Sequence, residues 1–137
     1  MTENKTTSRE LALAAIDAMK KSYSPYSNFT VGAALLTKEG KIYTGANIEN
    51  ASYTPTICAE RTAIFTAVHN GDRNFEAIAI VGGLRSDIKG VTAPCGVCRQ
   101  VMSEFCSPDF KVILVTSQDG YYEETTLGEL LPYTFKL

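Results

Sequence analysis

The sequence predicts an α/β fold, a three-layer α-β-α sandwich built on one mixed five-stranded sheet. Helical and strand-like segments alternate along the chain in the order α-β-β-α-β-α-β-β. The chain has 137 residues, of which 45% are hydrophobic, so we expect one domain spanning 1–137 with a real core. Only a short turn separates the last two strands, and we therefore expect them to be antiparallel.

Three helices and a final helical turn are predicted from apolar residues at helical spacing and from end signals. Thr7 and Glu10 have the spacing of a capping box before the first helix. Gly71 supplies a stop for the second helix, and Pro132 stops the final turn. The predicted helical segments are 11–23, 58–71, 96–105 and 127–132.

Five strands are predicted from apolar and β-branched runs. The glycine-bearing turn 38–40 favours an antiparallel hairpin between the first two strands. The third run, "FEAIAIVGG", is nearly continuously apolar, which is typical of a strand buried on both faces. The predicted strands are 29–37, 41–48, 75–83, 110–117 and 121–126.

Composition and charge argue against several classes of function. The formal net charge is −2, so no basic field attracts the protein to nucleic acid or anionic lipid. The first ten residues are polar, and the longest apolar runs are much shorter than a membrane span. We therefore expect a cytoplasmic protein with no nucleic-acid or membrane partner.

The stretch "TAPCGVCRQ" places Cys95 and Cys98 one helical turn apart at a predicted helix start. Unpaired amides and the helix dipole favour thiolates there. Alone, this spacing fits a redox pair or chance about as well as a metal site. Cys58 also opens a predicted helix, and two helix starts at one sheet edge can bring three thiolates together. Three protein ligands with one open position are typical of catalytic zinc, so we predict one Zn²⁺ per chain.

Two other potential ligands are interpreted as structural. Cys106 lies eight residues after Cys98, too far along the same helix to reach a metal at its start. We expect it to be a buried or semi-buried thiol. His69 is the only histidine and lies a full helix length from Cys58, so we expect a surface or capping role near a helix end. The predicted metal site is therefore all-thiolate.

Charged residues next to the cysteines complete the predicted chemistry. Glu60 follows Cys58 by two residues, and a carboxylate beside a metal-activated water can act as general base and then general acid. The alternative is a surface acid that favours the helix dipole. Three thiolates leave a zinc site with net negative charge, which guanidinium hydrogen bonds to sulfur would offset. We expect this role for Arg61 and, with less weight, for Arg99, although either could be an exposed helix residue.

The segments "CAER" and "PCGVCRQ" resemble the cytidine deaminase family. The similarity extends to "YSPYSNFTVGAALL", "GANIENASY" and "ELLPYTF" and so covers nearly the whole chain. Because the first cysteine of the set, Cys58, stands where other branches have histidine, the chain resembles the small three-cysteine, homotetrameric branch. This resemblance implies zinc-dependent hydrolysis of cytidine and 2'-deoxycytidine to uridine products and ammonia, a step of pyrimidine salvage.

The resemblance also implies a set of substrate-binding residues. Phe29 resembles the aromatic residue that stacks on the pyrimidine, and the backbone around Ala59 would contact the ring. Asn47 and Glu49 resemble the pair that holds the ribose hydroxyl, and their spacing along an expected strand places them on one face. Phe29 could instead be a core residue.

Three further residues are implied at the subunit interface of a homotetramer. Ala51, Tyr53 and Phe135 resemble residues that reach into the active site of a neighbouring subunit, so active sites would be shared between subunits. Phe135 could alternatively belong to a frayed tail.

Two rival functions remain at this point. A deaminase of another cytosine compound, such as a blasticidin S deaminase, would share the zinc motifs, although "NIENASY" resembles the ribose-binding segment of cytidine enzymes. A non-catalytic zinc-stabilised module is the rival from another class. A nucleic-acid editor is less favoured, because the acidic chain shows no basic groove in its sequence.

Overall fold

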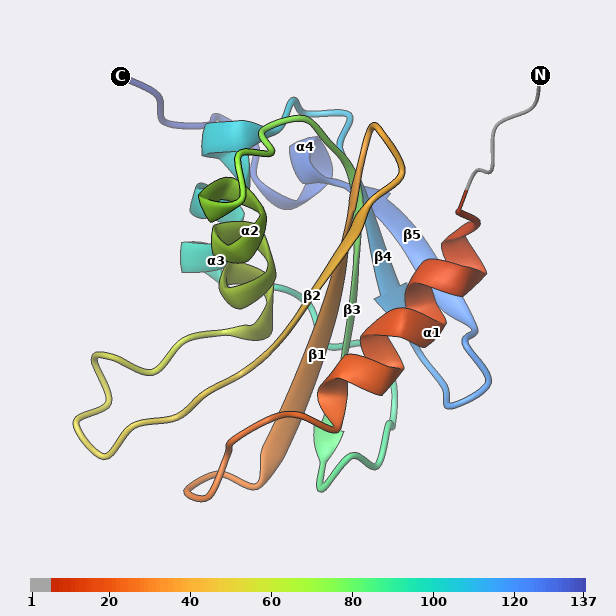
Figure 1. Cartoon of the computed structure of the whole chain (residues 1–137), viewed down its shortest axis with the longest axis vertical. Helices are drawn as coiled ribbons and strands as arrows, with labels where there is room; N and C mark the ends of the chain where they lie inside the picture. Colours follow the sequence, from red (N-terminus) through yellow and green to blue (C-terminus); the bar gives the residue numbers. More distant parts are fainter. Residues whose placement is uncertain (1–5) are drawn as a thin grey trace.

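The computed structural model describes residues 6–137, which form one five-stranded sheet with helices on both faces (Figure 1). The sheet order is β2-β1-β3-β4-β5. The helices are α1 (Ser8–Met19), α2 (Ala59–His69), α3 (Gly96–Phe105) and α4 (Leu127–Leu130). The strands are β1 (Phe29–Thr37), β2 (Ile42–Ala46), β3 (Phe75–Leu84), β4 (Lys111–Val115) and β5 (Tyr122–Thr126).

The sheet is mixed, as the sequence predicts. Strand β1 pairs antiparallel with both β2 and β3, and β5 pairs antiparallel with β4. Strands β3 and β4 pair in parallel, because helix α3 carries the chain back between them. The expected hairpin and the expected antiparallel final pair are both confirmed.

The helices form two layers around the sheet (Figure 1). Helix α1 begins with the predicted capping box of Thr7 and buries Leu11 and Met19 on one face. Helices α2 and α3 bury Ile64 and Met102 on the other face. These two clusters confirm the three-layer arrangement. The layer that contains α2 and α3 also carries the cysteines.

The second strand is shorter than predicted: it runs from Ile42 to Ala46, whereas the sequence predicts 41–48. At the next residue the side chain of Asn47 adds two bonds to β1 beside the main-chain bond from Asn47 N to Val31 O: its Nδ2 donates to Phe29 O at 2.9 Å, and its Oδ1 accepts from Val31 N at 2.9 Å. Ile48 then forms an isolated bridge to Ile57. The chain thus leaves the sheet at a side-chain contact that apolar periodicity does not reveal.

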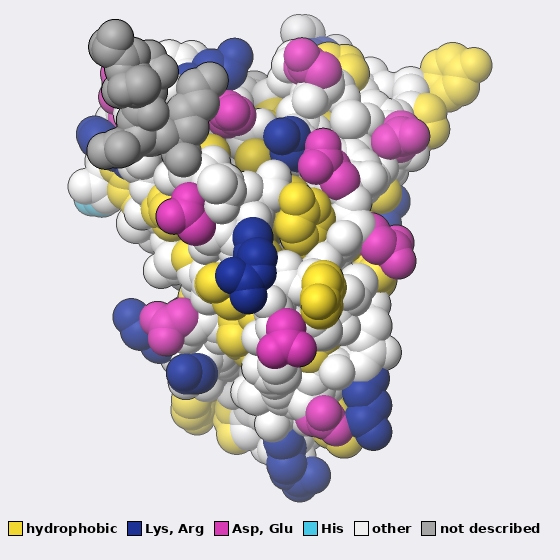
Figure 2. All heavy atoms as spheres, turned by 90° about the vertical axis from the view of Figure 1, so that its right-hand side faces the viewer, with side chains coloured by type: hydrophobic (Ala, Val, Ile, Leu, Met, Phe, Trp, Pro, Cys, Tyr) yellow, Lys and Arg dark blue, Asp and Glu magenta, His cyan; other side chains and the backbone are white. Residues whose placement is uncertain are grey.

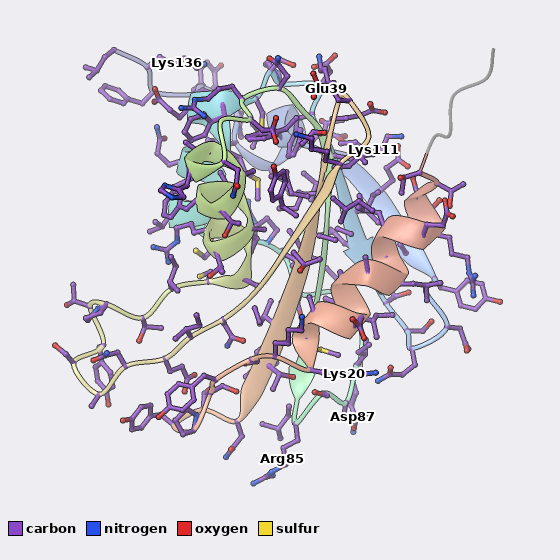
Figure 3. All side chains as sticks on the ribbon, in the orientation of Figure 1. Lys20, Glu39, Arg85, Asp87, Lys111 and Lys136 are labelled. Atoms are coloured by element: carbon purple, nitrogen blue, oxygen red, sulfur yellow. The ribbon has the colours of Figure 1, made fainter. Side chains whose placement is uncertain are left out.

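Charged side chains of both signs are mixed on the face that carries α1, where Figure 2 shows lysine and arginine next to aspartate and glutamate. Figure 3 labels Glu39 and Lys111 near one end of the sheet, Lys20, Arg85 and Asp87 near the other, and Lys136 on the C-terminal segment. Within residues 6–137, none of the helices combines the length and the apolar content that crossing a bilayer requires.

Gly45 allows α2 to lie directly against β2. A Cβ at this position would lie 2.6 Å from Ala59 O and 2.6 Å from Ala63 N, both main-chain atoms of α2. Any side chain would therefore push away the first turns of the helix that begins after Cys58. The position of α2 on the sheet depends on this missing side chain.

We predict that Gly45→Ala lowers the free energy of unfolding by about 3 kcal/mol, because backbone atoms must move to make room. Gly96→Ala is the control, since a Cβ there would meet nothing within 4 Å, and we expect a change below about 1 kcal/mol. Urea unfolding of both variants measures the difference. Equal stabilities would contradict the close packing of α2 on β2.

Candidate functional site

Three cysteine sulfurs meet where α2 and α3 begin. Cys58 is the N-cap of α2, Cys95 is the N-cap of α3, and Cys98 lies in the first turn of α3. Their sulfur atoms all lie within 4.8 Å of one another. The Cys58 and Cys95 sulfurs are 3.7 Å apart, and the Cys95 and Cys98 sulfurs are 3.5 Å apart. The structure thus brings together the three residues that the sequence singled out.

The helix starts supply hydrogen bonds to these sulfurs. Cys95 Sγ accepts from Cys98 N at 3.4 Å, which satisfies one of the free amides of α3. Cys58 makes no such cap bond, but its sulfur accepts from Arg61 Nη2 at 3.4 Å. Both helix dipoles also favour negative charge at this point. Amides, dipoles and a guanidinium therefore all stabilise thiolates here.

Cys58 and Cys98 differ in how readily their thiols lose a proton. The pKa of Cys58 is lowered to about 5, mainly by a hydrogen bond from Cys98 and further by Arg61. The pKa of Cys98 is raised, mainly because it donates to Cys58 and also because it is buried. A divalent cation would deprotonate every thiol that coordinates it.

Glu60 is a buried carboxyl group beside the sulfur cluster. The residue is only 3% exposed, and within residues 6–137 its Oε1 has no hydrogen-bond partner. Burial is the main reason that the pKa of Glu60 is raised to about 7. A buried acid without a partner costs free energy unless a bound group or a function needs it there.

The residues present fit a zinc ion. Three soft sulfur donors within reach of one point are a zinc-type ligand set, and they leave a fourth tetrahedral position open. The unpartnered oxygen of Glu60 gives the site a polar group that the protein itself does not satisfy. Cys106, buried at the end of α3, and His69, at the end of α2, do not belong to the cluster.

A family model described as the cytidine and deoxycytidylate deaminase zinc-binding region matches residues 5–114. The chain belongs to this family. A cytidine deaminase of Halalkalibacterium halodurans is 54% identical over 121 residues, which are 88% of this chain and 88% of the relative. The crystal structure of a cytidine deaminase from Burkholderia pseudomallei superimposes with a TM-score of 0.86 at 49% identity, covering 95% of this chain and 100% of that chain. The resemblance found in the sequence is confirmed.

A deaminase named for a different substrate is also similar to this deaminase chain. The blasticidin-S deaminase of Bacillus cereus is 38% identical over 109 residues, which are 77% of this chain and 76% of that protein. Family membership therefore identifies the zinc deaminase class, and the substrate has to be argued from the site.

The two arginines that follow the ligand motifs have different surroundings. Arg61 donates to the Cys58 sulfur, in the arrangement expected from the sequence. Arg99 does not follow that expectation: its Nε donates to Pro94 O at 2.7 Å and its Nη1 to Leu130 O at 2.8 Å. The side chain of Arg99 therefore fastens the loop before α3 to the end of α4, because these carbonyls need donors and lie within its reach.

The residues expected to bind the nucleoside lie at the ends of β1 and β2. Phe29 is the first residue of β1 and is 38% exposed, so it is not a plain core residue. Asn47 uses its amide to hold β1, as described above. The Glu49 carboxylate accepts from the amides of Tyr26 and Ser27 at 2.9 and 3.1 Å. Asn47 and Glu49 follow β2 and are not part of it, so strand alternation does not explain their positions.

Ser27 is a supporting residue that the sequence analysis missed. Its hydroxyl donates to Glu49, and the same oxygen accepts from Phe29 N at 3.0 Å. This single side chain thus links the predicted ribose-binding and base-stacking residues. The local signal was present, since a serine two residues before a strand start often accepts a main-chain amide.

The residues expected at a subunit interface are exposed, whereas Ala59, the first residue of α2, is completely buried in the core. Ala51 and Tyr53 lie in the turn between β2 and α2, and Tyr53 is 77% exposed. Phe135 lies in the C-terminal segment and is 66% exposed, with its carbonyl accepting from Gln100 Nε2 at 3.3 Å. Nothing in the described chain covers these two aromatic rings.

We predict that Arg61→Ala weakens zinc binding about 10- to 100-fold, because it removes the hydrogen bond to the Cys58 sulfur. Arg99→Ala is the matched control. It loses bonds to main-chain carbonyls, so it should lower the free energy of unfolding by about 1 kcal/mol or more with a much smaller effect on zinc. Chelator competition and thermal unfolding of both variants distinguish the two roles. Equal losses of zinc affinity would refute the assignment.

Proposed function

We propose that this chain is a zinc-dependent deaminase that hydrolyses cytidine and 2'-deoxycytidine to uridine or 2'-deoxyuridine and ammonia. The observation that carries this function is the buried carboxyl group of Glu60 beside three clustered sulfurs, with one oxygen that has no hydrogen-bond partner among residues 6–137. Cys58, Cys95 and Cys98 would hold the zinc ion. When bound, zinc would supply the Lewis acidity that makes water a nucleophile near neutral pH.

Glu60 is proposed as the proton carrier. The water oxygen adds to the ring carbon that bears the amino group, while Glu60 takes a water proton and passes it to the neighbouring ring nitrogen. Glu60 then takes the proton of the new hydroxyl group and gives it to the amino group. The carbon–nitrogen bond breaks, the carbonyl forms, and ammonia leaves. The low exposure of Glu60 supports this role, because bulk water does not compete for its oxygens.

The remaining residues would hold the substrate and balance charge. Arg61 would draw electron density from the Cys58 thiolate. Phe29, 38% exposed at the start of β1, would stack on the pyrimidine. Asn47 retains one amide N–H beyond the one it gives to Phe29 O, and this N–H is available to a ribose oxygen.

Glu49 would accept the ribose hydroxyl. Hydrogen bonds from Ser27 and from two main-chain amides lower its pKa, so the carboxylate is ionised near neutral pH. It borders a cavity of 390 Å³ that Tyr53 also lines. A charged acceptor at the wall of a cavity suits a sugar hydroxyl.

The exposed aromatic rings support a homotetramer with shared active sites. Tyr53 and Phe135 expose most of their surface, and with Ala51 they would complete the site of a neighbouring subunit. The whole chain would act as one domain. The protein would work in the cytoplasm, in pyrimidine salvage.

The second candidate substrate is blasticidin S, because a relative named for it is 38% identical. The test is ammonia release by the zinc-loaded protein from cytidine, 2'-deoxycytidine, blasticidin S and free cytosine, measured side by side. We expect release from the two nucleosides, since Asn47 and Glu49 would hold the sugar. Release from blasticidin S alone would favour the second candidate, and efficient release from free cytosine would refute the ribose contacts.

We predict that Glu60→Ala lowers kcat at least about 100-fold, because the proton carrier is lost. Zinc content and folding should be unchanged, because all three zinc ligands remain. Glu104→Ala, at an exposed position of α3, is the control and should match the wild type. Ammonia release, zinc analysis and circular dichroism are the measurements. Substantial activity in Glu60→Ala would contradict the proton-carrier role. A wild type that binds zinc but deaminates nothing would point to a structural zinc module.

We predict that Phe135→Ala reduces kcat/KM about tenfold while each subunit stays folded, because a ring that reaches a neighbouring site is lost. Leu137→Ala, in the same exposed segment, is the control and should leave the kinetics unchanged. Steady-state kinetics and sedimentation of both variants provide the comparison. Wild-type kinetics for Phe135→Ala would remove this residue from the shared site.

A further inference from the structure

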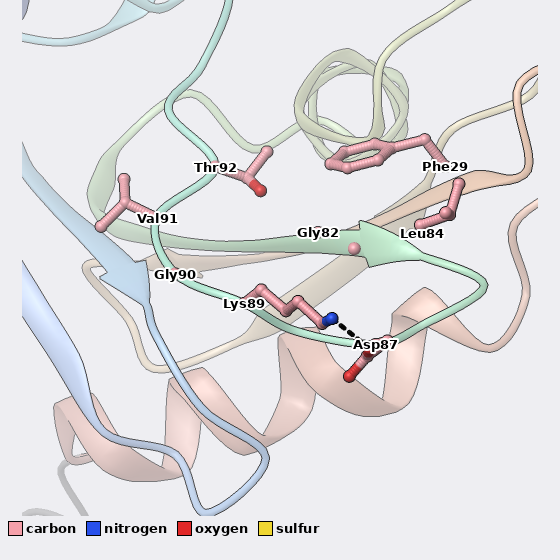
Figure 4. Close-up of a pocket in the computed structure, with 9 residues that line it drawn as sticks. Phe29, Gly82, Leu84, Asp87, Lys89, Gly90, Val91 and Thr92 are labelled. Atoms are coloured by element: carbon pink, nitrogen blue, oxygen red, sulfur yellow. Dashed lines mark ion pairs between the residues drawn. The ribbon is translucent and has the colours of Figure 1, made fainter.

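A cavity of 310 Å³ opens beside Phe29, on the face of the sheet that carries α2 and α3 (Figure 4). Phe29 comes from β1, Gly82 from β3, and Thr92 from the segment that leads to Cys95. Gly82 lies opposite Val31 of β1, next to the pair of Phe29 and Leu84. The cavity therefore connects the proposed base-stacking ring with the segment that leads to Cys95, a proposed zinc ligand.

Gly82 allows Thr92 and Phe29 to lie side by side. A Cβ on Gly82 would lie 2.8 Å from Thr92 Oγ1, 3.0 Å from Thr92 Cγ2 and 3.0 Å from Phe29 Cε2. The two side chains therefore meet over the bare backbone of β3, and any larger residue would push them apart. This packing fixes the hydroxyl of Thr92 next to the edge of the Phe29 ring.

The other polar side chains at the cavity do not compete for this position. Lys89 and Asp87 form an ion pair of 3.5 Å with each other, at its open rim, and both are mostly exposed (Figure 4). Thr92 is half-buried, and none of the hydrogen bonds among residues 6–137 involves its hydroxyl. A hydroxyl held in a cavity without a partner can both donate to and accept from a ligand.

We propose that Thr92 is a substrate-binding residue whose hydroxyl binds a polar atom of the pyrimidine stacked on Phe29. Gly82 is the positioning residue that seats it there. This inference rests on the proposed function and assigns to that site a contact from the loop before α3. The contact lies on the base, so it should contribute equally to the binding of cytidine and 2'-deoxycytidine.

The first test replaces Thr92 with valine, which keeps the shape and removes the hydroxyl, and with serine, which keeps the hydroxyl. Thr92→Val should raise KM about three- to tenfold for both nucleosides, with kcat and zinc content near wild type. Thr92→Ser should stay within about twofold of the wild type. Binding of uridine, measured by calorimetry, should weaken in Thr92→Val by a similar factor and reports the contact without turnover.

Several outcomes would overturn the inference. A wild-type KM and wild-type uridine affinity in Thr92→Val would exclude the hydroxyl contact. Equal losses in the valine and serine variants would show packing instead of hydrogen bonding. A loss for cytidine alone would place the contact on the ribose. A wild type that binds zinc but does not deaminate cytidine would overturn the proposed function and this inference with it.

Gly82→Ala provides a second, independent test of the positioning. Its methyl group must displace Thr92 or Phe29, so KM should rise at least as much as in Thr92→Val. Combining Gly82→Ala with Thr92→Val should add little to KM, because both changes remove the same contact. A fully additive rise in the double variant would separate Gly82 from Thr92 and contradict the pairing.

Discussion

The site depends on two helices beginning at the same place, so that their free amides and their dipoles act on one cluster of sulfur atoms. Cys58 and Cys95 cap α2 and α3, and their sulfurs are 3.7 Å apart. Thiolates this close repel one another unless positive charge holds them. The helix ends and Arg61 supply part of that charge, and a divalent cation would supply the rest. The sheet beneath makes this possible, because Gly45 lets α2 pack directly on β2.

A second constraint is the burial of Glu60. A carboxyl group that is 3% exposed, with an oxygen that has no partner in the described part of the chain, opposes folding. The packed core around α2, which includes Ala59 and Ala63, holds it in place. Such a group is retained where chemistry requires it, and the position of Glu60 next to the sulfurs suits it to a chemical role. The cost in stability and the proposed proton transfer therefore have the same structural origin.

Much of this arrangement could be predicted from the sequence, since the helices, strands and sulfur cluster follow from local patterns. Cysteines at two helix starts, and apolar residues repeating with the period of a helix or of a strand, are short-range signals. The interactions that were not predicted are long-range side-chain contacts. Arg99 bonds to Leu130, 31 residues away, and Asn47 ends β2 by bonding to β1. Spacing along the chain carries no information on such partners, so the different role of Arg99 could be found only from the structure.

X-ray absorption at the zinc edge tests the central claim most directly, because it counts the atoms bound to the metal. For the protein loaded with one zinc per chain, we predict three sulfur atoms at about 2.3 Å and one oxygen atom at about 2.0 Å. That result would match Cys58, Cys95 and Cys98 with one open position for water. Four sulfur atoms would indicate a closed structural site that includes Cys106, and fewer than three would contradict the cluster as the zinc site.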